Sequence, residues 1–249
     1  MKGLLQRLRG WLGAAAPGDG PPSPAAVAEL IAAIRGANLT YCGPPKLEQI
    51  AGAALRVRSE RVPGRFVEAG VALGGSAILL GALKPRGVPL DLYDAFAMIP
   101  PPGPGDGEDA HRRYAEIASG GSRGLGGDVY YGYLGDLQAR VLDNLRRFGL
   151  DPARDAIRCV PGLFADTLRP DGPVAFAHVD CDWYDSVRVC IERLTPLLSP
   201  GGIVVFDDYE SYSGCRRAVD EWLGSARGVE TIFRQRSLGV RRALGGATN

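Results

Sequence analysis

Short apolar runs that end in glycine or an acid alternate with helical stretches along this chain, and this alternation constrains its fold more than any other feature. Strands that follow one another through helices pair in parallel and leave helices on both faces of the sheet. The pattern therefore predicts an α/β fold with a doubly wound, mostly parallel sheet. Two further segments, VETIFR and LGVRRAL, are close enough to pair as an antiparallel hairpin at the edge, which brings the expected sheet to seven strands. The first five strand candidates are RFVEAG (65–70), VPLDLYD (88–94), IRCVPG (157–162), VAFAHVD (174–180) and GGIVVFDD (201–208).

Composition divides the chain around this core. Residues 1–24 are interpreted as an N-terminal arm and a Pro- and Gly-rich linker, and residues 25–249 as a single domain. Two helices are expected between residues 25 and 58, the second starting at Pro44. The stretch IPPPGPGDGEDA is too rich in Pro and Gly for regular structure. Together with the Gly-rich segment that follows, it predicts one mobile lid over an active site, residues 99–128.

The charge and the cysteines exclude several classes of function. The 29 Lys and Arg residues nearly balance 28 Asp and Glu, so no global field attracts nucleic acid or an anionic membrane. The five cysteines are odd in number and form no CxxC, which argues against a disulfide framework or a structural zinc site and for a cytoplasmic location. The first twelve residues gather their leucines and Trp11 on one helical face. That face predicts packing on the same subunit or on a partner, and a membrane-surface helix is the alternative.

Four of the five strand candidates end in an acid. In an open α/β sheet, ligands bind beyond the carboxyl ends of the strands, so these acids are expected to meet on one rim. The alternative is that they cap the following helices, as Asp182 is placed to do. Capping does not require paired acids, however, and the chain has such a pair. The strand-end acids are Glu68, Asp94, Asp180, and Asp207 with Asp208.

The first turn indicates which cofactor the rim binds. EAGVALGGSA, residues 68–77, is Gly-rich, but it is neither a GxGxxG motif nor a P-loop. The pyrophosphate of NAD would be repelled by further carboxylates on the rim. S-adenosylmethionine has no phosphate; its sulfonium and ammonium groups favour carboxylates, and Asp94 can bind its ribose hydroxyls. The composition of the rim therefore favours S-adenosylmethionine.

The remaining acids resemble a site for a hard cation. Asp180 ends one strand, and Asp207 and Asp208 end the strand expected beside it. Three carboxylates with no His or Cys close to them favour Mg²⁺, Mn²⁺ or Ca²⁺ over zinc. Such an ion can bind a substrate hydroxyl and lower its pKa, and positioning supplies much of the rate of a methyl transfer.

These segments resemble the macrocin O-methyltransferase family, which includes mycinamicin and noviose methyltransferases. The resemblance covers about residues 65–222 and rests on FVEAGVALGGSAI, YDAF…IPPP, DNLRRFGL, VPGLFADTL, HVDCDWYDSV and SPGGIVVFDDY…GCRRAVDEW. It implies a Rossmann-like class I methyltransferase fold, S-adenosylmethionine and Mg²⁺ as cofactors, a sugar hydroxyl of a natural product as acceptor, and a homodimer or higher homo-oligomer.

The resemblance also implies roles for individual residues. Asp180, Asp207 and Asp208 correspond to metal ligands, and Asp180 also stands where the family has its proposed general base. The chain departs from the family in having Ala95 in place of a serine, Trp183 in place of an aliphatic residue, and no Trp in the first turn. An acceptor face is interpreted from Trp183, Tyr184 and Tyr209, and neither His111 nor His178 is expected to be catalytic. The implied cofactor contacts are Glu68, Ala69, Gly70, Ser76, Asp94, Phe96, Gly162, Leu163, Phe164, Asp180 and Asp182.

The sequence thus predicts a Mg²⁺-dependent methyltransferase that acts on a sugar hydroxyl of a glycosylated small molecule. Methylation of an amino-sugar nitrogen is the nearest alternative, and a catechol-type acceptor is a weaker one. A non-catalytic cofactor-binding or assembly subunit is the alternative from another class. Retention of all three metal acids argues against that last reading, because a binding module does not need them.

Overall fold

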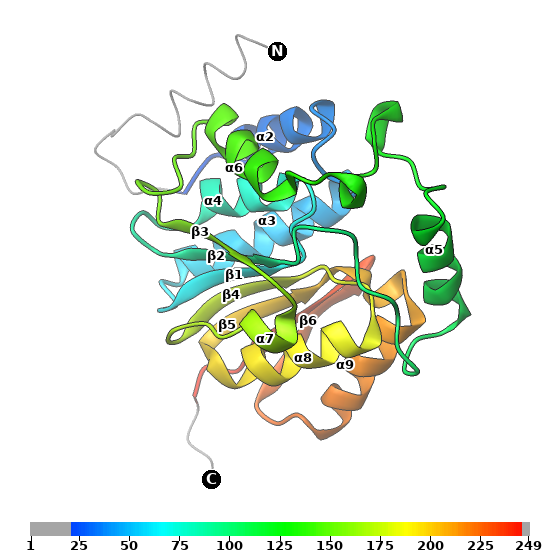
Figure 1. Cartoon of the computed structure of the whole chain (residues 1–249). Helices are drawn as coiled ribbons and strands as arrows, with labels where there is room; N and C mark the ends of the chain where they lie inside the picture. Colours follow the sequence, from blue (N-terminus) through cyan, green and yellow to red (C-terminus); the bar gives the residue numbers. More distant parts are fainter. Residues whose placement is uncertain (1–20, 246–249) are drawn as a thin grey trace.

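A computed structural model describes residues 21–245 of the chain (Figure 1). The predicted N-terminal arm lies almost wholly outside the described residues. Ser23 lies directly before the first described helix: its side chain accepts a hydrogen bond from the backbone N–H of Ala26 at 3.2 Å and caps that helix. The helices are α2 (Pro24–Gly36), α3 (Pro44–Ser59), α4 (Gly75–Leu83), α5 (Glu108–Ala118), α6 (Leu137–Arg147), α7 (Phe164–Thr167), α8 (Tyr184–Leu194) and α9 (Ser213–Ser225).

The strands form one seven-stranded sheet in the order β3-β2-β1-β4-β5-β7-β6. Strands β1 to β5 pair in parallel, and β7 runs antiparallel to both of its neighbours. This confirms the predicted mostly parallel sheet with an antiparallel hairpin at its C-terminal edge. The strands are β1 (Arg65–Ala69), β2 (Leu90–Asp94), β3 (Ile157–Pro161), β4 (Val174–Val179), β5 (Leu198–Phe206), β6 (Val229–Gln235) and β7 (Ser237–Arg242).

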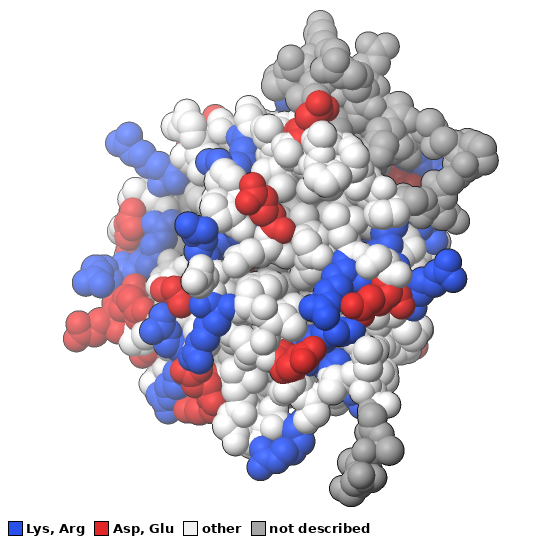
Figure 2. Space-filling view, turned by 180° about the vertical axis from the view of Figure 1, so that it is seen from behind, with Lys and Arg blue, Asp and Glu red and all other residues white. Residues whose placement is uncertain are grey.

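Helices cover both faces of the sheet. Helices α2, α3, α4 and α6 lie on one face, and α7, α8 and α9 lie on the other (Figure 1). Alternate residues of each strand enter the two cores, as a pleated strand requires: Phe66 packs toward α3 and α4, and Val67 toward α8. On the face shown in Figure 2, acidic and basic side chains are interspersed. Within residues 21–245, no helix combines the length and the apolar character needed to cross a bilayer.

The segment at residues 99–128 differs from its prediction in one respect. Helix α5 begins at Glu108, so the last three residues of IPPPGPGDGEDA are helical, and the expectation that this stretch has no regular structure is wrong there. The physical reason lies in the first turn, where Glu108 and Asp109 favour a helix N-terminus. Ala110 and Ile117 are buried and fix the inner side of the helix. The mobility of the segment stays a prediction.

Candidate active site

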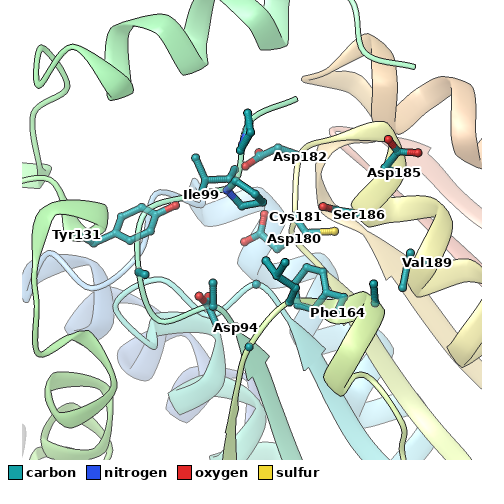
Figure 3. A pocket seen from close by; sticks show the side chains of 18 residues that line it. Asp94, Ile99, Tyr131, Phe164, Asp180, Cys181, Asp182, Asp185, Ser186 and Val189 are labelled. Carbon is teal, nitrogen blue, oxygen red and sulfur yellow. The ribbon is translucent and has the colours of Figure 1, made fainter. Parts of the chain in front are cut away.

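Two cavities lie beyond the carboxyl ends of the parallel strands. The smaller has a volume of about 240 Å³ and is lined mainly by apolar residues, among them Ile99, Phe164 and Val189. The larger has a volume of about 450 Å³ and is lined by acids and aromatic rings. Asp94, Asp180 and Asp182 point toward the smaller cavity, with Tyr131 on one side and Phe164 on the other (Figure 3). Both cavities share Gly70, Asp94, Tyr131, Asp180 and Asp182, so these residues form their common boundary.

The turn after β1 packs directly on the end of β4. Gly70 has a φ of 92°, and a Cβ at this position would lie 1.7 Å from the backbone oxygen of Asp180. The backbone N–H of Asp180 donates in turn to the carbonyl of Ala69 at 2.8 Å. Only glycine allows both the conformation and this close approach. The Gly-rich turn is therefore fixed against the strand that carries Asp180.

Asp94, at the end of β2, organises the first turn from within. One carboxylate oxygen accepts hydrogen bonds from the backbone N–H groups of Val71 and Ala72, at 2.6 and 3.2 Å. The other accepts from the N–H of Phe96 at 2.7 Å. Burial raises the pKa of Asp94, and the three amide donors act against that shift. The side chain thus holds the turn and still lines both cavities.

The other predicted cofactor contacts fall into two groups. Gly162, Leu163 and Phe164 line the smaller cavity, and Ser76 lines the larger. Glu68, Ala69 and Phe96 line neither cavity. The fully buried carboxylate of Glu68 faces His178 instead, with its oxygen 2.9 Å from Nδ1.

Four carboxylates gather where β4 and β5 end. Asp180, Asp182, Asp207 and Asp208 all line the larger cavity, and we call them the acid cluster. Burial, followed by repulsion from neighbouring carboxylates, raises the pKa of Asp180, Asp182 and Asp208. Three carboxylates that resist ionisation together indicate a site suited to a positive charge.

Asp207 differs from the other three because it has partners of its own. The ammonium of Lys46 lies 2.6 Å from Oδ2, the hydroxyl of Ser237 donates to Oδ1 at 3.2 Å, and His178 Nε2 lies 3.8 Å from Oδ1. Burial acts to raise the pKa of Asp207, but His178 and Lys46 lower it below its usual value. Burial also acts to lower the pKa of His178, but the carboxylates of Asp207 and Glu68 raise it to about 10.

The chain turns at Asp207, which allows two consecutive carboxylates to face one cavity. A short 3₁₀ helix, η4 (Asp207–Glu210), begins directly after β5. In a continuing strand, the two side chains would point to opposite faces of the sheet. The turn brings both to the larger cavity, as their predicted shared role requires.

Cys42 lies beside the acid cluster, which the sequence interpretation missed. Its Sγ is 3.8 Å from Asp207 Oδ2 and 4.0 Å from Asp180 Oδ2. The potential ligand atoms of Cys42, Asp180 and Asp207 all lie within 4.8 Å of one another. The expectation that no His or Cys lies close to these acids is therefore wrong, since His178 also lies 3.8 Å from Asp207. The thiol comes from the loop before α3, 138 residues away from Asp180, and no local pattern could show this approach.

The predicted acceptor face is only partly at the site. Trp183 lines the larger cavity, and its indole N–H donates to the carbonyl of Pro100 at 2.9 Å. Tyr184 and Tyr209 line neither cavity, because their hydroxyl groups donate to Glu221 and Asp220, at 2.6 and 2.7 Å, away from the cavities. The interpretation of these two tyrosines as acceptor contacts is not supported.

Other tyrosines line the larger cavity. Tyr131 packs against Tyr41 and Tyr130, with ring centroids 5.8 and 4.5 Å apart, and Tyr212 packs edge-on against Trp183 at 5.2 Å. All of them line the larger cavity together with the acids. They come from loops, where aromatic residues beside Gly and Pro in TYCGPP and YYGY were the available signal.

Comparisons with known proteins fit this geometry. The family model of the macrocin-O-methyltransferases (TylF) matches residues 34–235. One similar protein is the 8-demethyl-8-(2,3-dimethoxy-alpha-L-rhamnosyl)-tetracenomycin-C 4'-O-methyltransferase of Streptomyces olivaceus. The chain is 34% identical to it over 191 residues, a match that covers 74% of this chain and 67% of that protein. It is 33% identical over 195 residues to the demethyldecarbamoylnovobiocin O-methyltransferase of Streptomyces niveus, with the same coverage of 74% and 67%.

Solved structures give the fold. The structure of the O-methyltransferase NovP superposes with a TM-score of 0.67 at 27% identity, covering 97% of this chain and 99% of that one. An O-methyltransferase from Bacillus cereus in complex with SAH superposes with a TM-score of 0.54 at 16% identity, covering 88% and 92%, and shows likeness of fold alone. The fold is that of the class I methyltransferases, as expected. Because the family model spans most of the sequence and two relatives exceed 30% identity over 74% of it, the chain belongs to the macrocin O-methyltransferase family and is a methyltransferase.

Proposed function

We propose that the protein transfers the methyl group of S-adenosylmethionine to a sugar hydroxyl of a glycosylated small molecule, with Mg²⁺ or another hard divalent ion in the acid cluster. The observation that carries this proposal is the common boundary of the two cavities. A methyl donor in one and an acceptor in the other would meet at Asp180 and Asp182. The named substrates of the relatives, glycosylated antibiotics, support the choice of acceptor.

The smaller cavity suits the donor. Its apolar walls at Leu163 and Phe164 can enclose an adenine ring, and Asp94 can accept hydrogen bonds from ribose hydroxyls. When bound, S-adenosylmethionine supplies an electrophilic methyl group on a sulfonium. The boundary acids Asp180 and Asp182 then lie where positive charge needs neutralising.

The larger cavity suits the acceptor and the ion. Within residues 21–245, the acid cluster has the donor set that hard cations prefer, and the raised pKa values of three of its members fit a bound cation. Asp180, Asp207 and Asp208 would hold the ion, which when bound lowers the pKa of an acceptor hydroxyl. The tyrosines that line the same cavity can pack against the apolar face of a sugar; they are Tyr41, Tyr130, Tyr131 and Tyr212.

The transfer is a single displacement. S-adenosylmethionine, held by Asp94, Leu163 and Phe164, would supply the methyl group: the acceptor oxygen would form the new bond to carbon, and the sulfur would keep the electron pair of the bond that breaks. Asp180 takes the hydroxyl proton, because it borders both cavities. Tyr131 and the loop at Pro100 and Pro101 help to exclude water from the donor side.

Methyl transfer to an amino-sugar nitrogen is a second candidate, and the charge of the larger cavity favours it. Five acids line this cavity against two cations, Lys46 and Arg113. A cationic amino sugar would be attracted there, although the accepting nitrogen must lose its proton before it reacts.

Mass spectrometry tests the proposal. Purified protein is incubated with S-adenosylmethionine, Mg²⁺ and a library of neutral and amino glycosides, with and without EDTA. We expect a gain of one methyl on a sugar unit, lost with EDTA and lost in Asp180→Asn. Binding of S-adenosylmethionine by calorimetry without turnover on any glycoside would instead support a non-catalytic binding subunit. Fragmentation of the product separates oxygen from nitrogen methylation.

A further inference from the structure

Lys46 occupies a special position in the acid cluster. Its ammonium lies 2.6 Å from Asp207 Oδ2 and 2.9 Å from the backbone oxygen of Asp207, and 3.4 Å from the hydroxyl of Ser211. Three oxygen acceptors match the three donors of an ammonium group. Its side chain is 20% exposed, and that of Asp207 is 4% exposed, so solvent screens the pair only weakly.

The backbone holds this ammonium in place. Lys46 stands in the first turn of α3, and the residues that follow on that helix, Leu47 and Ile50, are fully buried in the core. Cys42, four residues earlier, also reaches the cluster. The approach of Lys46 to Asp207 is therefore built into the docking of α3 over the ends of β4 and β5.

Lys46 binds the oxygen of Asp207 that faces the interior of the cluster. Oδ2 of Asp207 is the oxygen 3.8 Å from the Cys42 thiol, and that thiol is 4.0 Å from Asp180. The other oxygen, Oδ1, faces Ser237 and His178. A divalent ion between Asp180 and Asp207 would therefore share its ligand oxygen with an ammonium, and the two cations would repel each other.

We propose that Lys46 is a built-in counter-ion of the acid cluster, which weakens divalent-ion binding and stabilises the fold when no ion is bound. This inference rests on the proposed ion site. Without Lys46, Oδ2 of Asp207 would lose its cationic partner, and Asp207 would keep only Ser237 and His178 at Oδ1. Lys46 is thus a positioning residue that sets the affinity of the cluster for its ion.

Calorimetric titration with MgCl₂ and MnCl₂ tests the proposal on the full chain. Lys46→Met and Lys46→Gln remove the charge, and Lys46→Arg keeps it as a matched control. We expect the Kd for each ion to fall by about fivefold or more in both neutral variants, since a repelling charge is removed, and to change little in Lys46→Arg. Without ion, the melting temperature of both neutral variants should fall, and added Mg²⁺ should raise it more than in the wild type.

The outcomes separate this inference from the proposed function. Unchanged or weaker ion binding in both neutral variants, with wild-type circular dichroism, overturns the role of Lys46 and leaves the ion site standing. A wild-type chain that binds neither ion overturns both. A neutral variant that folds only in the presence of the ion supports the proposal, because the ion then replaces the missing charge.

Discussion

The two carboxylate oxygens of Asp94 accept hydrogen bonds from the first turn and would also accept them from the proposed cofactor. Three backbone donors already hold its carboxylate, so any ribose hydroxyl would bind the remaining lone pairs. Glu68, on the neighbouring strand β1, has its carboxylate inside the protein against His178. Two acids that look alike at strand ends thus have different environments, and substitutions should separate them.

Asp94→Ala should weaken the binding of S-adenosylmethionine by about 1.5–3 kcal/mol, the range for hydrogen bonds to a charged group, and leave Mg²⁺ affinity nearly unchanged. Asp94→Asn, which keeps one acceptor oxygen, should lose less. Calorimetry with each ligand measures both effects. An equal loss of both affinities would show that Asp94 supports the fold rather than the cofactor.

The two neighbouring acids at the end of β5 should respond to substitution in opposite directions. Asp208 has a raised pKa, so its charge is unfavourable without an ion, and Asp208→Asn should raise the melting temperature of the ion-free protein by a few degrees. His178 and Lys46 lower the pKa of Asp207 and so stabilise its charge, and Asp207→Asn should therefore lower the melting temperature of the ion-free protein. With Mg²⁺, the wild type should gain more stability than either variant. Thermal melts with and without Mg²⁺ measure these shifts, and an Asp208→Asn variant that melts lower without ion would favour a capping role instead.

At the scale of elements, two carboxylates attach the segment around the start of α5 to neighbouring helices, in addition to the hydrogen bond from Trp183 to Pro100. Asp106 accepts hydrogen bonds from the backbone N–H groups of Gly103 and Tyr184, at 2.9 and 2.7 Å, which ties the loop to the start of α8. Asp109 accepts from the N–H and the hydroxyl of Ser213, both at 2.7 Å, which ties α5 to the start of α9. A lid in this region would therefore open by releasing helix N-termini.

Asp106→Ala should loosen that attachment. Loss of hydrogen bonds to a carboxylate should lower the free energy of local opening at residues 99–107 by about 1–3 kcal/mol, and hydrogen exchange should speed up there. Exposed Arg112, on α5, provides the control Arg112→Ala, which should exchange like the wild type. Addition of S-adenosylmethionine and a glycoside should slow exchange in the wild type. Unchanged exchange in the ternary complex would contradict the predicted lid.

The elements were largely predictable, but their docking was not. The strand end at Asp94 and the start of α3 at Pro44 follow from local patterns of apolar residues, Gly and Pro, and the structure confirms them, whereas the strand predicted to end at Asp180 ends one residue earlier, at Val179. The contacts of Cys42 and Lys46 with Asp207 join residues 165 and 161 positions apart. Such contacts depend on how α3 packs across the sheet, which no window of sequence contains. The position of Tyr184 away from both cavities has the same cause, because its hydroxyl donates to Glu221 of α9.

At the scale of the whole molecule, one buried lysine should make stability depend on pH. Lys84 is 6% exposed and donates to the carbonyl of Asp155 at 2.7 Å, and burial lowers its pKa from 10.5 to about 8. Between these two values the unfolded chain binds more protons at this site than the folded one, so this contribution to stability rises with pH.

Melting temperatures of the wild type and Lys84→Met from pH 7 to pH 10.5 should show this effect. The difference between wild type and variant should shift in favour of the wild type above about pH 8, when Lys84 loses its proton in the folded state. Exposed Arg86 provides the control Arg86→Met, which should follow the wild type throughout. A constant difference between wild type and Lys84→Met over this range would contradict the prediction.

Light scattering on the same samples would check the homo-oligomer that the family resemblance predicts.

The acids and the tyrosines that line the larger cavity come from different kinds of element. Its acids lie at or just after the ends of β2, β4 and β5, whereas Tyr41, Tyr130 and Tyr131 lie outside the sheet, on a loop and at the start of a 3₁₀ helix, η2 (Tyr131–Tyr133). Loops tolerate change that a buried strand end does not. A library that varies Tyr41 and Tyr130, which line only the larger cavity, would therefore change the surface proposed for the acceptor and leave the acid cluster unaltered.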